Sequence, residues 1–180
     1  MQTDHPESIL PINKICFLDI DGVLNSKFWN DSHQREISVG KYIDRDKVKL
    51  LGLLIRDTGA KLVLHSGWRF WFDDQLKPLR AEAADLVHLL AEENMTLHDM
   101  TPDLTTEEIR TAKKFSLVKA REILAWLKVH PDVKTWVVLD DLNLNHNTVA
   151  SHQVRTDANM GLTMEDIDTA KIILSQEHLQ

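Results

Sequence analysis

The sequence predicts an α/β fold with a mostly parallel central sheet and helices on both faces. Three short apolar runs alternate with longer segments of helical periodicity: ICFLDI (15–20), AKLVLHS (60–66) and TWVVLDD (135–141). Runs of this kind are typical of strands that are covered on both faces. Strands that alternate with helices form right-handed βαβ units with parallel strands. Each run also ends in polar residues, which this architecture gathers at one edge of the sheet.

The first half of the chain contains two of these strands and one clear helix. Residues 1–12 are polar and contain prolines, which predicts a loose lead-in to a single domain over 13–180. The polar segment 26–44, with scattered aromatic residues, predicts a flap region. A helix over 45–59 follows, ending at Gly59, from the apolar spacing of Val48, Leu51, Leu54 and Ile55.

The second half repeats the alternation. Residues 73–94 predict helical material interrupted near Pro78, and 96–104 predict a short strand and a loop. Residues 116–130 predict an amphipathic helix whose apolar side holds Leu117, Ala120, Ile123, Leu124 and Leu127. After the strand at 135–141, a short strand at 153–157 and a helix capped by Thr163 complete the pattern. No internal repeat or low-complexity linker divides the chain.

The composition excludes several classes of protein. With 43% hydrophobic and 27% charged residues and a net charge of −7, the chain is typical of soluble globular proteins and gives no support to a broad nucleic-acid or membrane surface. The one cysteine, Cys16, lies inside an apolar run, so no disulfide framework is expected. No apolar stretch approaches the ~20 residues of a membrane span. We expect a cytoplasmic protein without membrane partners.

Four carboxylates follow the ends of two predicted strands. Asp19 and Asp21 follow the first, and Asp140 and Asp141 follow the last long one. Like charges gathered at one edge need a compensating cation. Mg²⁺ prefers oxygen ligands and substrate phosphates, and the histidines show no zinc-ligand spacing. The constellation therefore predicts Mg²⁺ and a phosphorylated ligand.

Four segments, in this order, carry a resemblance to a known superfamily. They are FLDIDGVLN (17–25), KLVLHSGWR (61–69), VKAREILAWL (118–127) and WVVLDD (136–141). Together they resemble the four motifs of the haloacid dehalogenase (HAD) superfamily of phosphotransferases. The segments SGWR, KAREILAWL and VRTDANMGLT look most like its small, capless group named for a "Swiss army knife" RNA-repair context. The resemblance implies a HAD-like Rossmannoid fold without a large cap domain.

The resemblance also implies roles for the two acids of the first motif. Asp19 would be the nucleophile that forms an aspartyl-phosphate. Asp21 would be the general acid–base that protonates the leaving oxygen and then activates water, and its backbone carbonyl would be a metal ligand. Both residues are therefore expected at the metal.

The remaining motifs imply the rest of the site. Ser66 would donate a hydrogen bond to the phosphoryl oxygens, and Lys119 would offset charge on the nucleophile and the phosphoryl group. Asp141 would bind Mg²⁺, with Asp140 as second ligand or orienting group. Two nearby cations, Lys114 and Arg121, remain alternatives to Lys119 on the same helix.

The SGWR segment is the predicted substrate contact. Ser66, Gly67 and Arg69 would face the phosphate, and the arginine fork suits bidentate binding of oxygens. The aromatic run Trp68–Phe72 is expected to be mostly packing, with one or two rings free to stack on a flat group. His65 is either a core histidine or a residue that shapes substrate choice.

The predicted function is a Mg²⁺-dependent phosphohydrolase that works through an aspartyl-phosphate. The open site would admit a nucleotide, a nucleic-acid end, a phosphoprotein or a small phosphate ester. Two alternatives stay open: a non-catalytic binding or regulatory module with the same fold, and a phosphotransferase whose acceptor is not water. A phospho-receiver domain is disfavoured, because receivers carry their acidic pair on the first strand and the phosphoacceptor on a later one.

Overall fold

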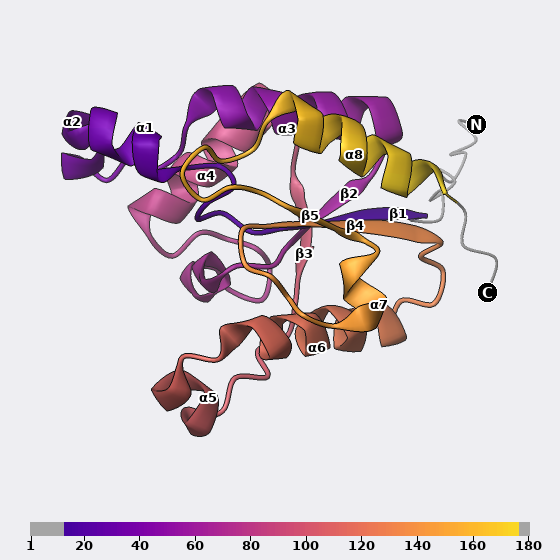
Figure 1. The fold of residues 1–180 in the computed structure, drawn as a ribbon. Coiled ribbons are helices and arrows are strands. Elements are labelled where there is room, and N and C mark those ends of the chain that lie inside the picture. Colours follow the sequence, from indigo (N-terminus) through magenta and orange to yellow (C-terminus); the bar gives the residue numbers. More distant parts are fainter. Residues whose placement is uncertain (1–12, 177–180) are drawn as a thin grey trace, which may run out of the picture.

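A five-stranded sheet, in which all strands run parallel, forms the centre of the molecule in the computed structural model (Figure 1). The structure describes residues 13–176, so the predicted lead-in 1–12 lies outside the described residues. The sheet has the order β3-β2-β1-β4-β5, with strands β1 (Lys14–Leu18), β2 (Lys61–Leu64), β3 (Leu97–Met100), β4 (Thr135–Asp140) and β5 (Gln153–Arg155). The predicted fold class is confirmed.

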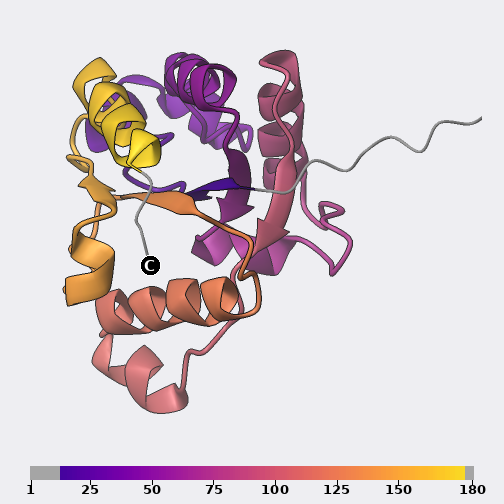
Figure 2. The same cartoon turned by 90° about the vertical axis from the view of Figure 1, so that its right-hand side faces the viewer.

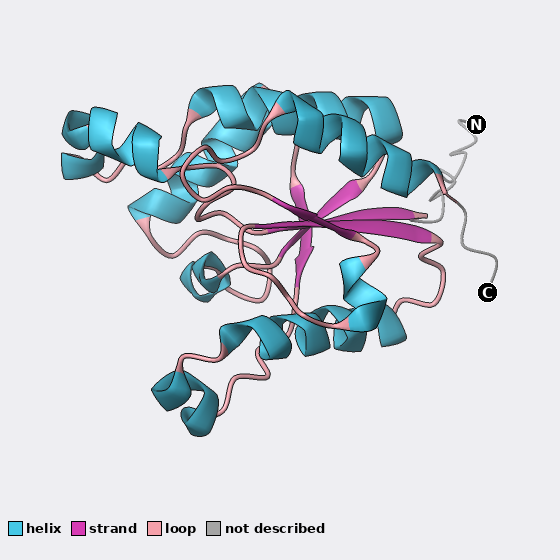
Figure 3. Ribbon diagram, in the orientation of Figure 1, coloured by secondary structure: helices cyan, strands magenta, loops and turns pink. Residues whose placement is uncertain are grey.

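Helices cover both faces of the sheet (Figures 2 and 3). One face packs against α3, α4 and α8, and the other against α6 and α7. The helical elements are α1 (Lys27–Ser32), α2 (Gln34–Ser38), α3 (Arg45–Thr58), the 3₁₀ helix η1 (Gly67–Trp71), α4 (Ala81–Glu92), α5 (Glu107–Ala112), α6 (Phe115–Lys128), α7 (Asn147–Ala150) and α8 (Met164–Ser175).

The core follows the two-residue period of the strands. In β1, Cys16 and Leu18 belong to the cluster under α3 and α8, whereas Ile15 and Phe17 pack with Trp126 of α6. Successive side chains of a strand point to opposite faces, so a continuous apolar run serves both layers. This burial is why the strand ends, and the acids beyond them, are held in one place.

Local signals set the helix ends as the sequence predicts. Gly59 adopts the left-handed conformation (φ 69°) at the end of α3. Thr163 forms a capping box with Asp166 at the start of α8. The predicted face of α6 is partly wrong: Leu117 is exposed, and Val118 and Trp126 are buried instead.

Two short helical segments project from the carboxyl edge of the sheet. The predicted flap 26–44 contains α1 and α2, and the connection between β3 and α6 contains α5; the two segments lie on either side of that edge (Figure 1). The order of the strands reverses at β1, since β2 lies on one side and β4 on the other. Open parallel sheets bind ligands at such a point. Within residues 13–176, no large cap domain covers this edge.

Candidate active site

Three carboxylates meet beyond the ends of β1 and β4. Asp19, Asp140 and Asp141 each offer an oxygen, and these oxygens lie within 4.8 Å of one another. The backbone positions them, because the Asp19 amide donates a 3.0 Å hydrogen bond to the carbonyl of Leu139. Asp19 and Asp140 are buried and Asp141 is half-buried. The hard oxygen donors of this cluster suit a divalent cation such as Mg²⁺.

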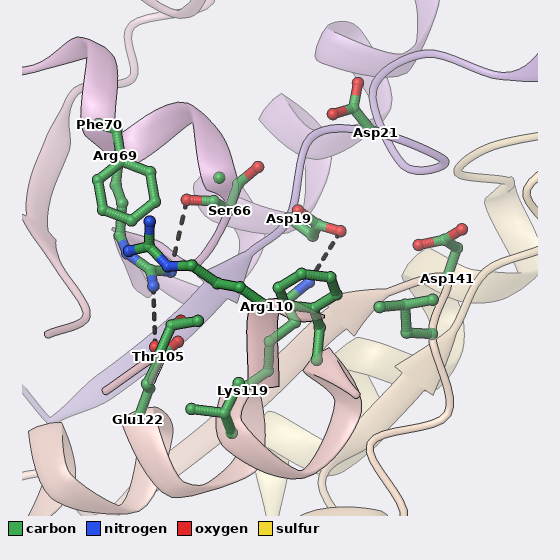
Figure 4. A pocket seen from close by; sticks show the side chains of 14 residues that line it. Asp19, Asp21, Ser66, Arg69, Phe70, Thr105, Arg110, Lys119, Glu122 and Asp141 are labelled. Atoms are coloured by element: carbon green, nitrogen blue, oxygen red, sulfur yellow. Dashed lines mark hydrogen bonds and ion pairs between the residues drawn. The ribbon is translucent and has the colours of Figure 1, made fainter. Parts of the chain in front are cut away.

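Lys119 brings a positive charge into the same cluster from α6. Its ammonium lies 3.1 Å from Asp19 Oδ2 (Figure 4). It also forms an ion pair with Asp140 Oδ2. The two alternatives that the sequence left open, Lys114 and Arg121, have exposed side chains. The structure thus brings Lys119 to the carboxylates.

The crowding of charge is visible in the pKa values. Burial, with the neighbouring charge of Asp19, raises the pKa of Asp140 to about 7, and the same causes raise the pKa of Asp141. Burial acts to lower the pKa of Lys119, but its ion pairs with Asp19 and Asp140 outweigh this and raise it. The lysine therefore stays charged, while the carboxylates favour a further cation.

Asp21 is held apart from this cluster. Its carboxylate oxygens accept hydrogen bonds from Asn25 Nδ2 (2.9 Å) and from the indole nitrogen of Trp68 (3.1 Å). It lines the same cavity as Asp19 but its carboxylate is not among the three grouped oxygens. The structure therefore separates the carboxylates of the two acids of the first motif.

The loop after Asp21 fits closely against Asp141. Gly22 has φ +75°, and its carbonyl accepts a 2.7 Å hydrogen bond from Thr156. Arg155 Nε donates to the carbonyl of Asp141 at 3.0 Å. Residues at the end of β5 therefore form hydrogen bonds to the loop after β1 and to the loop after β4. The sequence alone did not predict this contribution.

The predicted substrate residues lie at the start of η1. Ser66 is the N-cap of η1, accepting a 3.4 Å hydrogen bond from the Trp68 amide, and Gly67 lines the cavity beside it. Arg69 also lines the cavity, but its guanidinium donates a 2.8 Å hydrogen bond to the buried Glu122 and lies 3.5 Å from Asp103. Its charge is therefore already engaged with two acids.

Glu122 is a residue that the sequence analysis missed. It lies one helical turn after Lys119 on α6 and accepts hydrogen bonds from Arg69 and from the Leu104 amide (3.0 Å). Burial raises its pKa, partly offset by those two partners. Glu122 thereby connects η1, α6 and the loop that leads to α5. The i to i+3 spacing from Lys119 was the available signal.

His65 belongs to the core. Its ring is fully buried, with Nδ1 3.1 Å from Thr101 Oγ1 and Nε2 3.9 Å from Asp140 Oδ2. Burial, followed by the charges of Lys119 and Arg69, holds the pKa of His65 well below its usual range. The histidine is therefore neutral near pH 7, and it does not line the cavity.

A cavity of about 470 Å³ opens above these groups (Figure 4). Of the aromatic run, Phe70 lines it, whereas Trp68 and Phe72 are buried. Residues that the sequence did not indicate complete the wall: Thr105, Arg110, Phe115, Val118, Glu122 and Leu142. Thr105 and Arg110 come from α5 and the loop before it, which carry no recognisable motif.

Comparison with known proteins places the chain in a family. Residues 15–167 match the family model described as the HAD domain in Swiss Army Knife RNA repair proteins. No curated protein and no solved structure matches the chain. In the part of the chain that the structure describes, none of the helices has the length and apolarity to cross a membrane. The match includes all four motif segments and the three grouped acids, and the chain therefore belongs to the HAD-domain family of Swiss Army Knife RNA repair proteins.

Proposed function

We propose that the protein is a Mg²⁺-dependent phosphomonoesterase that works through an aspartyl-phosphate on Asp19. The observation that carries this proposal is the contact of Lys119 with Asp19 beside the grouped oxygens of Asp140 and Asp141. A nucleophilic carboxylate, a fixed cation and a divalent-metal site are the parts that phosphoryl transfer requires.

The metal would be held by Asp19, Asp141 and Asp140, with the backbone carbonyl of Asp21 as a further ligand. When bound, it would neutralise the carboxylates and the phosphoryl oxygens. Asp140 has a second task, since it also pairs with Lys119 and accepts a 2.9 Å hydrogen bond from the Leu142 amide. It orients the lysine as well as offering an oxygen to the metal.

The chain's own residues would carry two chemical steps. In the first, an Asp19 oxygen attacks phosphorus, the bond to the leaving oxygen breaks, and the Asp21 carboxyl protonates that oxygen. In the second, Asp21 takes a proton from water, which attacks phosphorus, releases phosphate and regenerates Asp19. Ser66 and Gly67 would contact the phosphoryl oxygens, while Arg69 braces η1 through Glu122.

Phosphate release from p-nitrophenyl phosphate tests this proposal. We expect turnover that requires Mg²⁺, stops with EDTA and is abolished in Asp19→Asn. Asp168→Asn, on the exposed side of α8, is the matched control and should retain turnover. In Asp21→Asn the second step should be slow, so that a phosphorylated chain accumulates and is detected by intact-mass spectrometry.

The alternatives give different results in the same assays. A non-catalytic module would release no phosphate from any ester and would show the same ligand binding in wild type and Asp19→Asn. A phosphotransferase would form a new phosphate ester when an acceptor alcohol is added, instead of free phosphate. The open carboxyl edge of the sheet supports bulky substrates, such as a nucleotide, a nucleic-acid end or a phosphoprotein.

A further inference from the structure

The cavity is larger than a phosphoryl group requires. Its volume of about 470 Å³ falls in the range of sites that enclose a whole small ligand. Figure 4 shows Asp141 and Phe70 at opposite ends, with Asp19 between them. The acids and Lys119 account for one end. The other end therefore offers room for the group to which the phosphate is attached.

Exposed apolar side chains also line the cavity. Phe70 of η1, Phe115 of α6 and Leu142 after β4 are 55%, 39% and 38% exposed, and all three line the cavity. A single exposed apolar residue is ordinary. Three from separate elements that line one cavity beside a nucleophilic carboxylate indicate an apolar ligand, and two phenyl rings favour a planar one.

Arg110 adds a cation to this apolar lining. Its side chain is 53% exposed, and its contact to Asp103 Oδ2 is long, at 3.5 Å. Arg69, by contrast, is 8% exposed and bonded to Glu122 at 2.8 Å. A guanidinium carries five N–H donors, so Arg110 keeps most of its donors for a ligand. It is the better placed of the two arginines to bind an anionic group.

We propose that Phe70, Phe115 and Arg110 form a leaving-group subsite for a planar ring that carries an anionic substituent. The inference rests on the proposed function, and it names the specificity of that same site. The ring lies against the two phenylalanines while its phosphate reaches Asp19, and Arg110 binds the anionic substituent. The preferred substrates are phosphomonoesters of alcohols that bear such a ring.

Two pairs of esters test the subsite. Benzyl phosphate and cyclohexylmethyl phosphate both release a primary alcohol and differ in whether the ring is planar. 4-Carboxybenzyl phosphate differs from benzyl phosphate by one negative charge. We expect wild type to have the higher kcat/KM for the planar ester of the first pair and for the charged ester of the second.

Variants assign each preference to a residue. Phe70→Leu and Phe115→Leu should each lower the planar-ring preference by roughly 3- to 10-fold, the size of one aromatic contact. Arg110→Gln should remove the preference for the carboxylate. Phe28→Leu, whose ring is 56% exposed on α1, and Arg121→Gln are matched controls that should leave both preferences unchanged.

A further pair of phosphate esters tests how the ring is attached to the phosphate in the preferred substrate. Adenosine 5′-phosphate and ribose 5-phosphate differ by a base carried on a sugar. A preference for the adenosine ester that falls in Phe70→Leu supports a ring carried on a sugar. A phenylalanine-dependent preference seen only for benzyl phosphate supports a ring joined by one carbon.

The failure of the subsite can be told apart from the failure of the proposed function. If the esters are hydrolysed with Mg²⁺ and Asp19 but both ratios are the same in wild type and the three variants, the subsite is overturned and the phosphatase stands. If no ester is hydrolysed, the phosphatase fails, and calorimetry with benzylphosphonate and cyclohexylmethylphosphonate tests the subsite alone. Tighter binding of the benzyl compound that depends on Phe70 supports it, and equal binding overturns it.

Discussion

Gly22 leaves no space for a side chain beside Asp141: a Cβ placed on Gly22 would lie 2.6 Å from the carboxyl carbon of Asp141. The glycine also has φ +75°, a conformation that residues with a Cβ rarely adopt. Because Gly22 of the first motif has no side chain, it leaves room for the Asp141 carboxylate of the fourth motif. The turn after Asp21 and the Asp141 carboxylate are therefore packed as one unit.

Gly22→Ala is expected to displace the Asp141 carboxylate and lower phosphatase activity by about 100-fold, the effect of a misplacement near 1 Å. Gly40→Ala is the control, because Gly40 has φ +80° and no atom within 4 Å of its added Cβ. Both variants should lose about 1–2 kcal/mol of stability from the left-handed backbone. Equal activity in the two would contradict the role of the close contact. Phosphate release and thermal unfolding give the two measurements.

Lys119→Met should lower kcat by about 10²–10³-fold, since one stabilising charge on the transferring group is lost. The same change leaves Asp19 and Asp140 without their resident cation, so Mg²⁺ should bind more tightly in compensation. Lys114→Met and Arg121→Met test the neighbouring cations and should behave as wild type. If Lys119→Met stays active while Lys114→Met or Arg121→Met loses activity, the cation that stabilises the transferring group is at that other position. Steady-state kinetics with Mg²⁺ titration provides the data.

The raised pKa of Asp140, about 7, predicts a pH-dependent stability in the presence of EDTA. The folded protein holds the proton more tightly than the unfolded chain. This stabilisation is complete below the ordinary carboxyl pKa of about 4 and is lost as the pH rises towards 7. The unfolding free energy of wild type relative to Asp140→Asn should therefore fall across that window, by at most about 1.4 kcal/mol per pH unit.

Saturating Mg²⁺ should reverse that trend, because the ion binds the ionised carboxylate. The pKa of His65 is lowered by burial and by the charges of Lys119 and Arg69, which are present in both proteins, so its contribution to the two unfolding free energies is similar. Urea denaturation from pH 4 to pH 7, with EDTA or Mg²⁺, measures the effect. If the unfolding free energy of wild type relative to Asp140→Asn rises with pH in EDTA, the pKa of Asp140 is not raised in the folded protein.

Trp68→Phe removes the indole donor that holds Asp21 at 3.1 Å while keeping an aromatic ring. If Asp21 transfers the proton, we expect kcat to fall by about tenfold, the effect of one hydrogen bond to a charged group, with KM little changed. Trp71→Phe controls for lost packing, because Trp71 lies beside Trp68 with ring centroids 4.7 Å apart. An equal fall of kcat in Trp71→Phe would show that the effect of Trp68→Phe comes from lost packing.

Cys16 is the one cysteine of the chain and is fully buried in β1. Burial raises the pKa of its thiol to about 12, so the reactive thiolate is almost absent from the folded protein. The native protein should not react with a thiol reagent at mildly alkaline pH, and the unfolded chain should react completely. Rapid native labelling would show that the central strand opens readily. Absorbance of the released reagent reports the rate.

The acidic cluster was predictable because it depends on topology. Parallel strands end at one edge, so acids after the first and fourth strands must meet there once the order of elements is known. That rule places Asp19, Asp21, Asp140 and Asp141 at one edge, and the pairing of β1 with β4 brings three of the carboxylates together. The resemblance favoured Lys119 but left Lys114 and Arg121 as alternatives, and the structure places Lys119 in contact with two of these acids.

The far wall of the cavity was not predictable, because it depends on contacts between distant segments. Glu122 bonds to Arg69, 53 residues earlier, and Trp68 bonds to Asp21, 47 residues earlier. Arg110 stands on a short helix with no motif. The periodicity of α6 also favoured Leu117 as a core residue, whereas packing buries Val118 and Trp126. Tertiary packing, and not the apolar periodicity of the sequence, therefore decides which side chains of α6 are buried.

The ion pair of Lys119 with Asp19 and Asp140 sets the electrostatic balance of the cluster formed by Asp19, Asp140 and Asp141. Three ionised carboxylates and one ammonium leave two formal negative charges, which a divalent ion cancels. With a divalent ion bound, this cluster would be neutral, and in a chain of net charge −7 it would exert no long-range pull on an anionic ester. The encounter with substrate is then not steered by charge. Recognition must instead come from short-range contacts made after the ester has entered.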